Sequence, residues 1–73
     1  MAASAKNDKI LNIAKPYVSI KGSNVYIKRT DIEPLSAAMM EVSNVYCGTT
    51  VENGSEIYVV RSMRKVYFQA FVE

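Results

Sequence analysis

The chain has 73 residues, a net charge of +2, a hydrophobic share of 49% and a charged share of 22%. This length predicts one small domain, and this composition excludes a disordered tail. Histidine is absent and cysteine occurs once, which excludes an internal disulfide and removes the commonest general base and metal ligand.

The N-terminal part predicts a flexible start over residues 1–7, followed by a single α+β domain over residues 8–73. Residues 8–14 have helical spacing, and Pro16 ends this short helix because the residue before a proline disfavours helical geometry. No apolar run approaches the roughly 20 residues of a membrane span, and a signal-peptide core is missing. We therefore expect a cytoplasmic protein with no membrane partner.

A β-hairpin is predicted around residues 21–24, Lys-Gly-Ser-Asn. Glycine at the first central position, Gly22, suits a two-residue type II′ turn. This turn brings aliphatic residues together on one face and polar and aromatic residues on the other. The predicted pairs are Ile20–Val25, Ser19–Tyr26 and Val18–Ile27.

An amphipathic helix is predicted next, with its cap at Thr30. Thr30 and Glu33 have the spacing of a capping box, in which each side chain bonds to the backbone amide of the other. Apolar residues then recur at helical spacing, namely Ile32, Leu35, Met39, Val42 and Tyr46. We expect this helix to include Cys47, to stop at Gly48 and to cover the aliphatic face of the sheet.

The C-terminal residues predict a short edge strand over residues 49–52, a turn at Asn53-Gly54, and strands over residues 56–61 and 66–72. A four-residue loop, Ser62-Met63-Arg64-Lys65, joins the last two strands. Its even length predicts the pairs Val59–Phe68 and Ile57–Ala70. The predicted fold is α+β: two β-hairpins form one antiparallel sheet with an amphipathic helix on one face, in the order ββαββ.

Each of the four strands of the two predicted hairpins places one tyrosine opposite its aliphatic residues. The second face of the sheet would therefore carry aromatic rings together with lysines. Basic residues concentrate on the strands, whereas residues 31–56 contain acidic residues and no basic ones. We expect folding to polarise the domain, which the small net charge conceals.

No motif for catalysis, metal binding or phosphate cradling occurs in the chain, so we expect no enzyme, no cofactor, no metal site and no small-molecule substrate. Three interpretations of the tyrosine face stay open. Tyrosine is a good strand former, which alone explains its placement. The face also suits a protein interface, either in a homodimer or on a larger partner. Finally, bases could stack on the rings while lysines and arginines meet phosphates.

The segregation of charge favours nucleic acid, DNA or RNA, whereas the modest net charge argues the other way. We predict a non-enzymatic, homodimeric protein that binds nucleic acid through the sheet face and the basic loop. The alternative is an accessory or inhibitory protein that docks on another protein through the same face. The predicted nucleic-acid-binding residues are Tyr17, Lys21, Tyr26, Lys28, Arg29, Tyr58, Arg61, Arg64, Lys65 and Tyr67.

Overall fold

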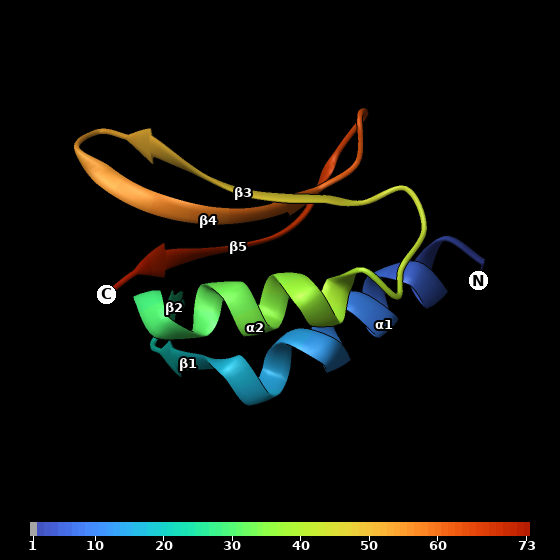
Figure 1. Cartoon of the computed structure of the whole chain (residues 1–73), viewed down its shortest axis with the longest axis horizontal. Helices are drawn as coiled ribbons and strands as arrows, with labels where there is room; N and C mark the ends of the chain where they lie inside the picture. The colour runs from blue at the N-terminus through green and yellow to red at the C-terminus, as the bar shows by residue number, and fades with distance from the viewer. Residues whose placement is uncertain (1) are drawn as a thin grey trace.

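The computed structural model describes residues 2–73 and confirms a small α+β domain (Figure 1). Helices α1 (Ala2–Ala14) and α2 (Arg29–Met39) pack on one face of the sheet, and a short 3-10 helix, η1 (Lys15–Tyr17), follows α1. The strands are β1 (Val18–Lys21), β2 (Asn24–Ile27), β3 (Tyr46–Glu52), β4 (Ser55–Arg61) and β5 (Val66–Val72). Their order across the sheet is β1-β2-β5-β4-β3.

Strand β5 lies at the centre of the sheet, antiparallel to β4 and parallel to β2. The sheet is therefore mixed, and the prediction of a wholly antiparallel sheet is wrong at this one junction. A parallel pair requires a long crossover, which α2 and the β3–β4 hairpin provide. Turn residues predict pairing within a hairpin, but they do not indicate which strands of two hairpins will meet.

The first hairpin has the predicted register, in which Ile20 pairs with Val25 and Val18 with Ile27. Gly22 has a φ of 64°, and Ser23 is not among the residues with positive φ, as a type II′ turn requires. The β3–β4 turn also follows its sequence signal. Its two central residues have φ values of 51° and 81°, which is the left-handed geometry of a type I′ turn.

Helix α1 begins at Ala2, whereas the predicted helix began at residue 8. Residues 2–7, predicted as a flexible segment, therefore have a helical backbone, and residue 1 lies outside the described residues. The alanines at the start of the chain are strong helix formers, which explains the extension. The fully buried Ile10 and Ala14 attach this helix to the core.

Helix α2 differs from the prediction at both ends. It begins at Arg29 with Lys28 as its cap and no side-chain cap bond, so the capping box at Thr30 is wrong. It ends at Met39, well before Gly48: residues 40–42 bond to the carbonyls three positions earlier, and Asn44 adopts left-handed geometry with a φ of 61°. The residues from Tyr46 onward then form β3, where β-branched and aromatic side chains are favoured.

The four-residue loop between β4 and β5 is confirmed, but a β-bulge beside it changes the register. Arg61 pairs with Val66 while Val60 pairs with Phe68, which leaves Tyr67 as the extra residue. A shift of one residue exchanges the two faces of a strand pair. The predicted pairs Val59–Phe68 and Ile57–Ala70 are therefore wrong, and the observed pairs are Val59–Gln69 and Tyr58–Ala70.

Because of this register, Tyr58 belongs to the core. Its side chain is fully buried beneath the helices, and its hydroxyl lies 3.1 Å from Ser36 Oγ on α2. Burial raises the pKa of the Tyr58 hydroxyl, so the group stays neutral. The core comprises Ile10, Ala14, Ile27, Leu35, Met39, Val42, Tyr58, Val60, Phe68 and Ala70.

Replacing Tyr58 tests this placement. Tyr58→Ala should lower the free energy of unfolding by about 3–5 kcal/mol, because it leaves a ring-sized cavity. Tyr58→Phe should cost only about 0.5–1.5 kcal/mol, the usual contribution of one hydrogen bond. Urea denaturation followed by circular dichroism measures both. Equal stability of the wild type and Tyr58→Ala would show that the ring lies outside the core.

Candidate nucleic-acid interface

The face of the sheet that points away from the helices, here called the outer face, carries fewer tyrosines than predicted. Of the four rings assigned to it, Tyr26 alone lies there, with its ring centroid 5.7 Å from that of Phe71. Tyr58 is buried in the core, and Tyr17 and Tyr67 pack against the core from the helix side. The predicted continuous tyrosine platform is therefore wrong.

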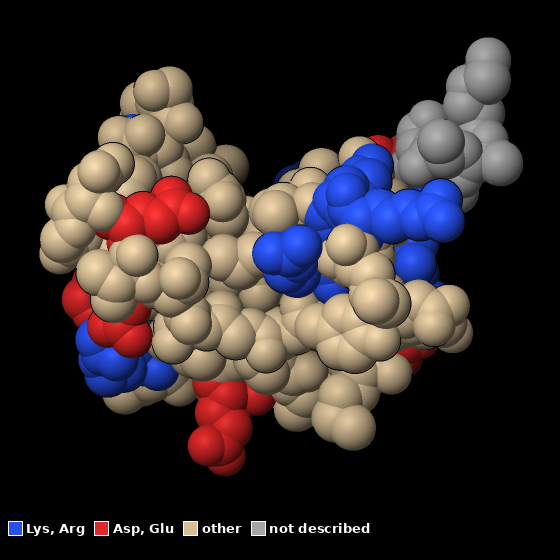
Figure 2. Space-filling view, turned by 90° about the horizontal axis from the view of Figure 1, so that it is seen from above, with Lys and Arg blue, Asp and Glu red and all other residues tan. Residues whose placement is uncertain are grey.

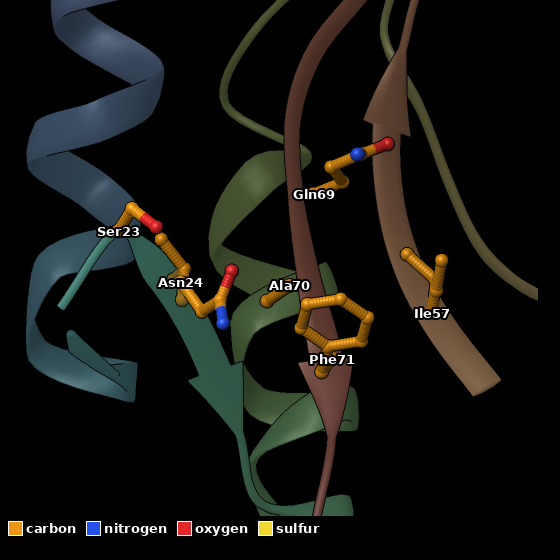
Figure 3. Close-up of a pocket in the computed structure, with 7 residues that line it drawn as sticks. Ser23, Asn24, Ile57, Gln69, Ala70 and Phe71 are labelled. Atoms are coloured by element: carbon orange, nitrogen blue, oxygen red, sulfur yellow. The ribbon is translucent and has the colours of Figure 1, made fainter. Parts of the chain in front are cut away.

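The outer face has a shallow depression of about 260 Å³ between β2 and β4. Figure 3 shows the Phe71 ring over β5, with Ile57 of β4 beside it. The lining residues are Ser23, Asn24, Val25, Ile57, Gln69, Ala70 and Phe71. None of these side chains is charged, so the depression offers no cation to a phosphate.

Two of the predicted phosphate-binding residues are engaged in ion pairs where β5 terminates. Lys21 Nζ lies 3.4 Å from a carboxylate oxygen of Glu73, and Arg29 donates two hydrogen bonds to the carboxylate of Glu56. The hydrogen bonds with Arg29 lower the pKa of Glu56, and those with Glu56 raise the pKa of Arg29. Lys28, the exposed cap of α2, is the remaining basic residue that was predicted to bind phosphate on this part of the chain.

The pair of Arg29 and Glu56 predicts how stability depends on pH. The folded-state pKa of Glu56 is lowered, so its stabilising effect is present above the unfolded value of about 4.3 and is lost as pH falls through the folded value. Glu56→Gln should therefore lose less stability than the wild type between pH 6 and pH 2. Urea midpoints measured across this range test it, and parallel curves for the two proteins would contradict it.

The loop between β4 and β5 brings together four of the predicted residues, namely Arg61, Arg64, Lys65 and Tyr67. Ser62 orders this loop: its Oγ accepts hydrogen bonds from the backbone N–H groups of Arg64 and Lys65, both at 3.3 Å. The backbone N–H of Ser62 also donates to the carbonyl of Lys65 at 2.8 Å. The basic side chains therefore project from a hydrogen-bonded loop.

Helix α1 contributes one further basic residue, Lys6, which was not predicted from the sequence to belong to the site. Lys6 Nζ lies 5.3 Å from the centroid of the Tyr67 ring, and Lys65 Nζ lies 4.8 Å from the same centroid. Both distances suit cation–π contacts. The bulge explains this meeting, because it turns Tyr67 toward the helix side of the sheet. Lys6, Arg61, Arg64 and Lys65 are called the basic tip below.

The basic tip is not neutralised by acidic neighbours. Within residues 2–73 the ion pairs are those of Lys21 and Arg29, so no member of the basic tip takes part in one. Figure 2 shows the larger group of Lys and Arg side chains right of centre, over the β4–β5 end, and a smaller group at the lower left beside acidic side chains. On the face shown, the larger basic group is therefore the one at the β4–β5 end.

A pocket of about 390 Å³ opens beside the basic tip; it is called the tip pocket below. Tyr46, at the start of β3, contributes a ring that is 58% exposed. The pocket is lined by Asn44, Tyr46, Ser62, Met63, Arg64, Lys65 and Tyr67, and no carboxylate is among them. The sequence analysis missed Tyr46 because its spacing from Val42 suited the apolar stripe of a longer helix.

No other kind of site emerges from the part of the chain that the structure describes. Residues 2–73 contain no cluster of three or more metal-ligating side chains, and their helices are too short or too polar to cross a membrane. Cys47, expected late in a helix, is a partly buried free thiol in β3. The chain matches no known protein family, no curated protein and no solved structure, so its function must be inferred from its own geometry.

Proposed function

We propose that the protein binds single-stranded nucleic acid at the basic tip and the tip pocket. The observation that carries this proposal is a pocket lined by two tyrosines, Arg64 and Lys65 and by no carboxylate, with Lys6 also lying over the Tyr67 ring. The proposal keeps the class of ligand expected from the sequence and moves the site from the sheet face to one end of the sheet.

The basic tip supplies the electrostatic part of the binding. Arg61, Arg64 and Lys65 are exposed and belong to no ion pair of the described residues, so their charges are available to phosphates. Arginine donates a planar pair of N–H groups that matches the oxygens of a phosphate. Lysine and arginine contacts of this kind give most of the affinity of non-specific binding.

The tyrosines supply the stacking part. Tyr46 presents the more accessible ring, whereas the ring of Tyr67 already holds the ammonium groups of Lys6 and Lys65. We therefore assign base stacking to Tyr46 and the positioning of the lysines to Tyr67. An unpaired base exposes its flat face to such a ring, whereas a base within a duplex is stacked on its neighbours, so we favour single strands.

The contribution of phosphate contacts is tested by Arg64→Ala. Binding of a fluorescent single-stranded oligonucleotide of random sequence is followed by anisotropy at several salt concentrations. The slope of log affinity against log salt should become shallower by about 0.7, the value for one lost contact to a single strand. Lys28→Ala is the matched control: it removes the same charge from an exposed site outside the basic tip and should leave the slope unchanged.

The stacking role of Tyr46 is tested in the same assay. Tyr46→Ala should weaken binding by about 1–3 kcal/mol, the usual contribution of one stacked base, while Tyr46→Phe should retain the wild-type affinity. Tyr26→Ala serves as the control because its ring lies beside Phe71 and does not line the tip pocket. An absence of binding at low salt, or equal losses for Tyr46→Ala and Tyr26→Ala, would contradict the proposed site.

A second candidate function is docking on another protein through the outer face. It is supported by Phe71, which is 37% exposed on this face, and by the partly exposed Val59; no helix lies over either side chain. Interfaces are built around such apolar and aromatic centres. If nucleic acid fails to bind, Phe71→Asp and Arg64→Ala distinguish the two surfaces in a pull-down.

A further inference from the structure

Strand β3 forms one edge of the sheet, and no other strand of residues 2–73 pairs with its outer side. In Figure 1 it is the outermost strand, on the side of the sheet farthest from β1. It pairs with β4 without interruption over seven residues, from Tyr46 to Glu52. An open edge of this length presents a row of unpaired backbone N–H and C=O groups, which is a template for another strand.

The usual protections of an edge strand are missing from β3. It contains no proline, lysine or arginine, it has no bulge, and its single charge is Glu52 at the end. The opposite edge, β1, is only four residues long and ends in Lys21. The β1 edge is therefore short and ends in a charged residue, whereas the β3 edge is longer and uncharged up to its last residue. Of the two edges, β3 is the one suited to pairing.

The tight turn after β3 determines which backbone groups point outward. The residues that flank a two-residue turn form a hydrogen-bonded pair, here Glu52 and Ser55, and such pairs alternate with non-hydrogen-bonded ones. The backbone groups of Thr50 therefore point toward β4. Those of Cys47, Thr49 and Val51 point away from β4, toward the open edge.

The geometry points to a homodimer in which β3 pairs antiparallel with β3 of a second copy, with Thr49 on the two-fold axis. Thr49 then pairs with Thr49 of the second copy, and Cys47 with its Val51. This register uses every outward-pointing residue and forms three hydrogen-bonded pairs, whereas centring on Gly48 or Thr50 forms two. Shifts by one residue would bring opposite faces of the two sheets together.

The side chains of β3 are compatible with this register. Val51 is 68% exposed, and pairing covers it with Cys47 of the second copy. An added Cβ at Gly48 would meet no atom within 4 Å, so Thr50 of the second copy finds space there. Glu52 comes to lie beside the uncharged Tyr46 of the second copy, so the only charge of the strand does not face a like charge.

Charge variants at Thr49 test this dimer, because like charges directly opposite each other on paired strands are destabilising. In sedimentation without nucleic acid, the wild type should show twice the 8.1 kDa mass of the chain at micromolar concentration. Thr49→Lys and Thr49→Glu should each raise the dimer dissociation constant at least tenfold, and an equimolar mixture of the two should restore dimers. Ser19→Lys, on the other edge strand, is the matched control and should leave the dimer intact.

Hydrogen exchange of the wild type gives a second readout that does not depend on the variants. The amides of Cys47, Thr49 and Val51 should exchange more slowly as protein concentration rises, while the amide of Thr50, already bonded to β4, should not change. A wild type that stays monomeric at millimolar concentration would overturn the inference. So would a dimer that tolerates Thr49→Lys, or one whose Thr49 amide exchanges freely.

Discussion

The one-residue bulge at Tyr67 decides which side of β4 meets the helices. It shifts the pairing of β4 against β5, so that Tyr58 and Val60 lie over Ala70 and Phe68 in the core. The outer face consequently receives Ile57 and Val59. The same bulge turns the Tyr67 ring toward α1, where Lys6 and Lys65 approach it. The bulge thus determines which β4 residues enter the core, which lie on the outer face, and where Tyr67 meets the lysines of the basic tip.

Local signals in the sequence were sufficient wherever turn chemistry and apolar alternation agreed. The glycine at position 22 and the Asn53-Gly54 pair have the backbone geometry their turns require, and the first hairpin has the predicted register. The strands β4 and β5 also lie close to their predicted residues. Each of these features depends on neighbours within a few positions, which is why one sequence suffices to predict them.

The faces of β4 could not be predicted in the same way. The run Ile57-Tyr58-Val59-Val60 has apolar or aromatic residues at every position, so alternation does not choose between its two sides. Which face of β4 meets the helices depends on its pairing with β5, through a bulge that no residue type in the sequence predicts. The hydroxyl groups of Ser36 and Tyr58 form a hydrogen bond, so the tyrosine is buried without leaving its polar group unpaired.

The candidate site was predicted in part. The basic residues of the β4–β5 loop and Tyr67 were predicted from the sequence, because basic and aromatic residues cluster in this part of the chain. Lys21 and Arg29 were also assigned to it, yet they pair with carboxylates that are far away in the chain. Tyr46 was missed because its spacing continued the apolar stripe of α2 beyond the point where the helix ends, and Lys6 because α1 reaches β5 only in three dimensions.

The central position of β5 has a consequence for how the chain folds. The strand that joins the two halves of the sheet is the one synthesised after all the others described here. Its pairing with β2 spans residues 26 to 72, so the chain must close a long loop before this contact contributes. The β1–β2 and β3–β4 hairpins can form early on the ribosome, but they remain separate until β5 emerges between them.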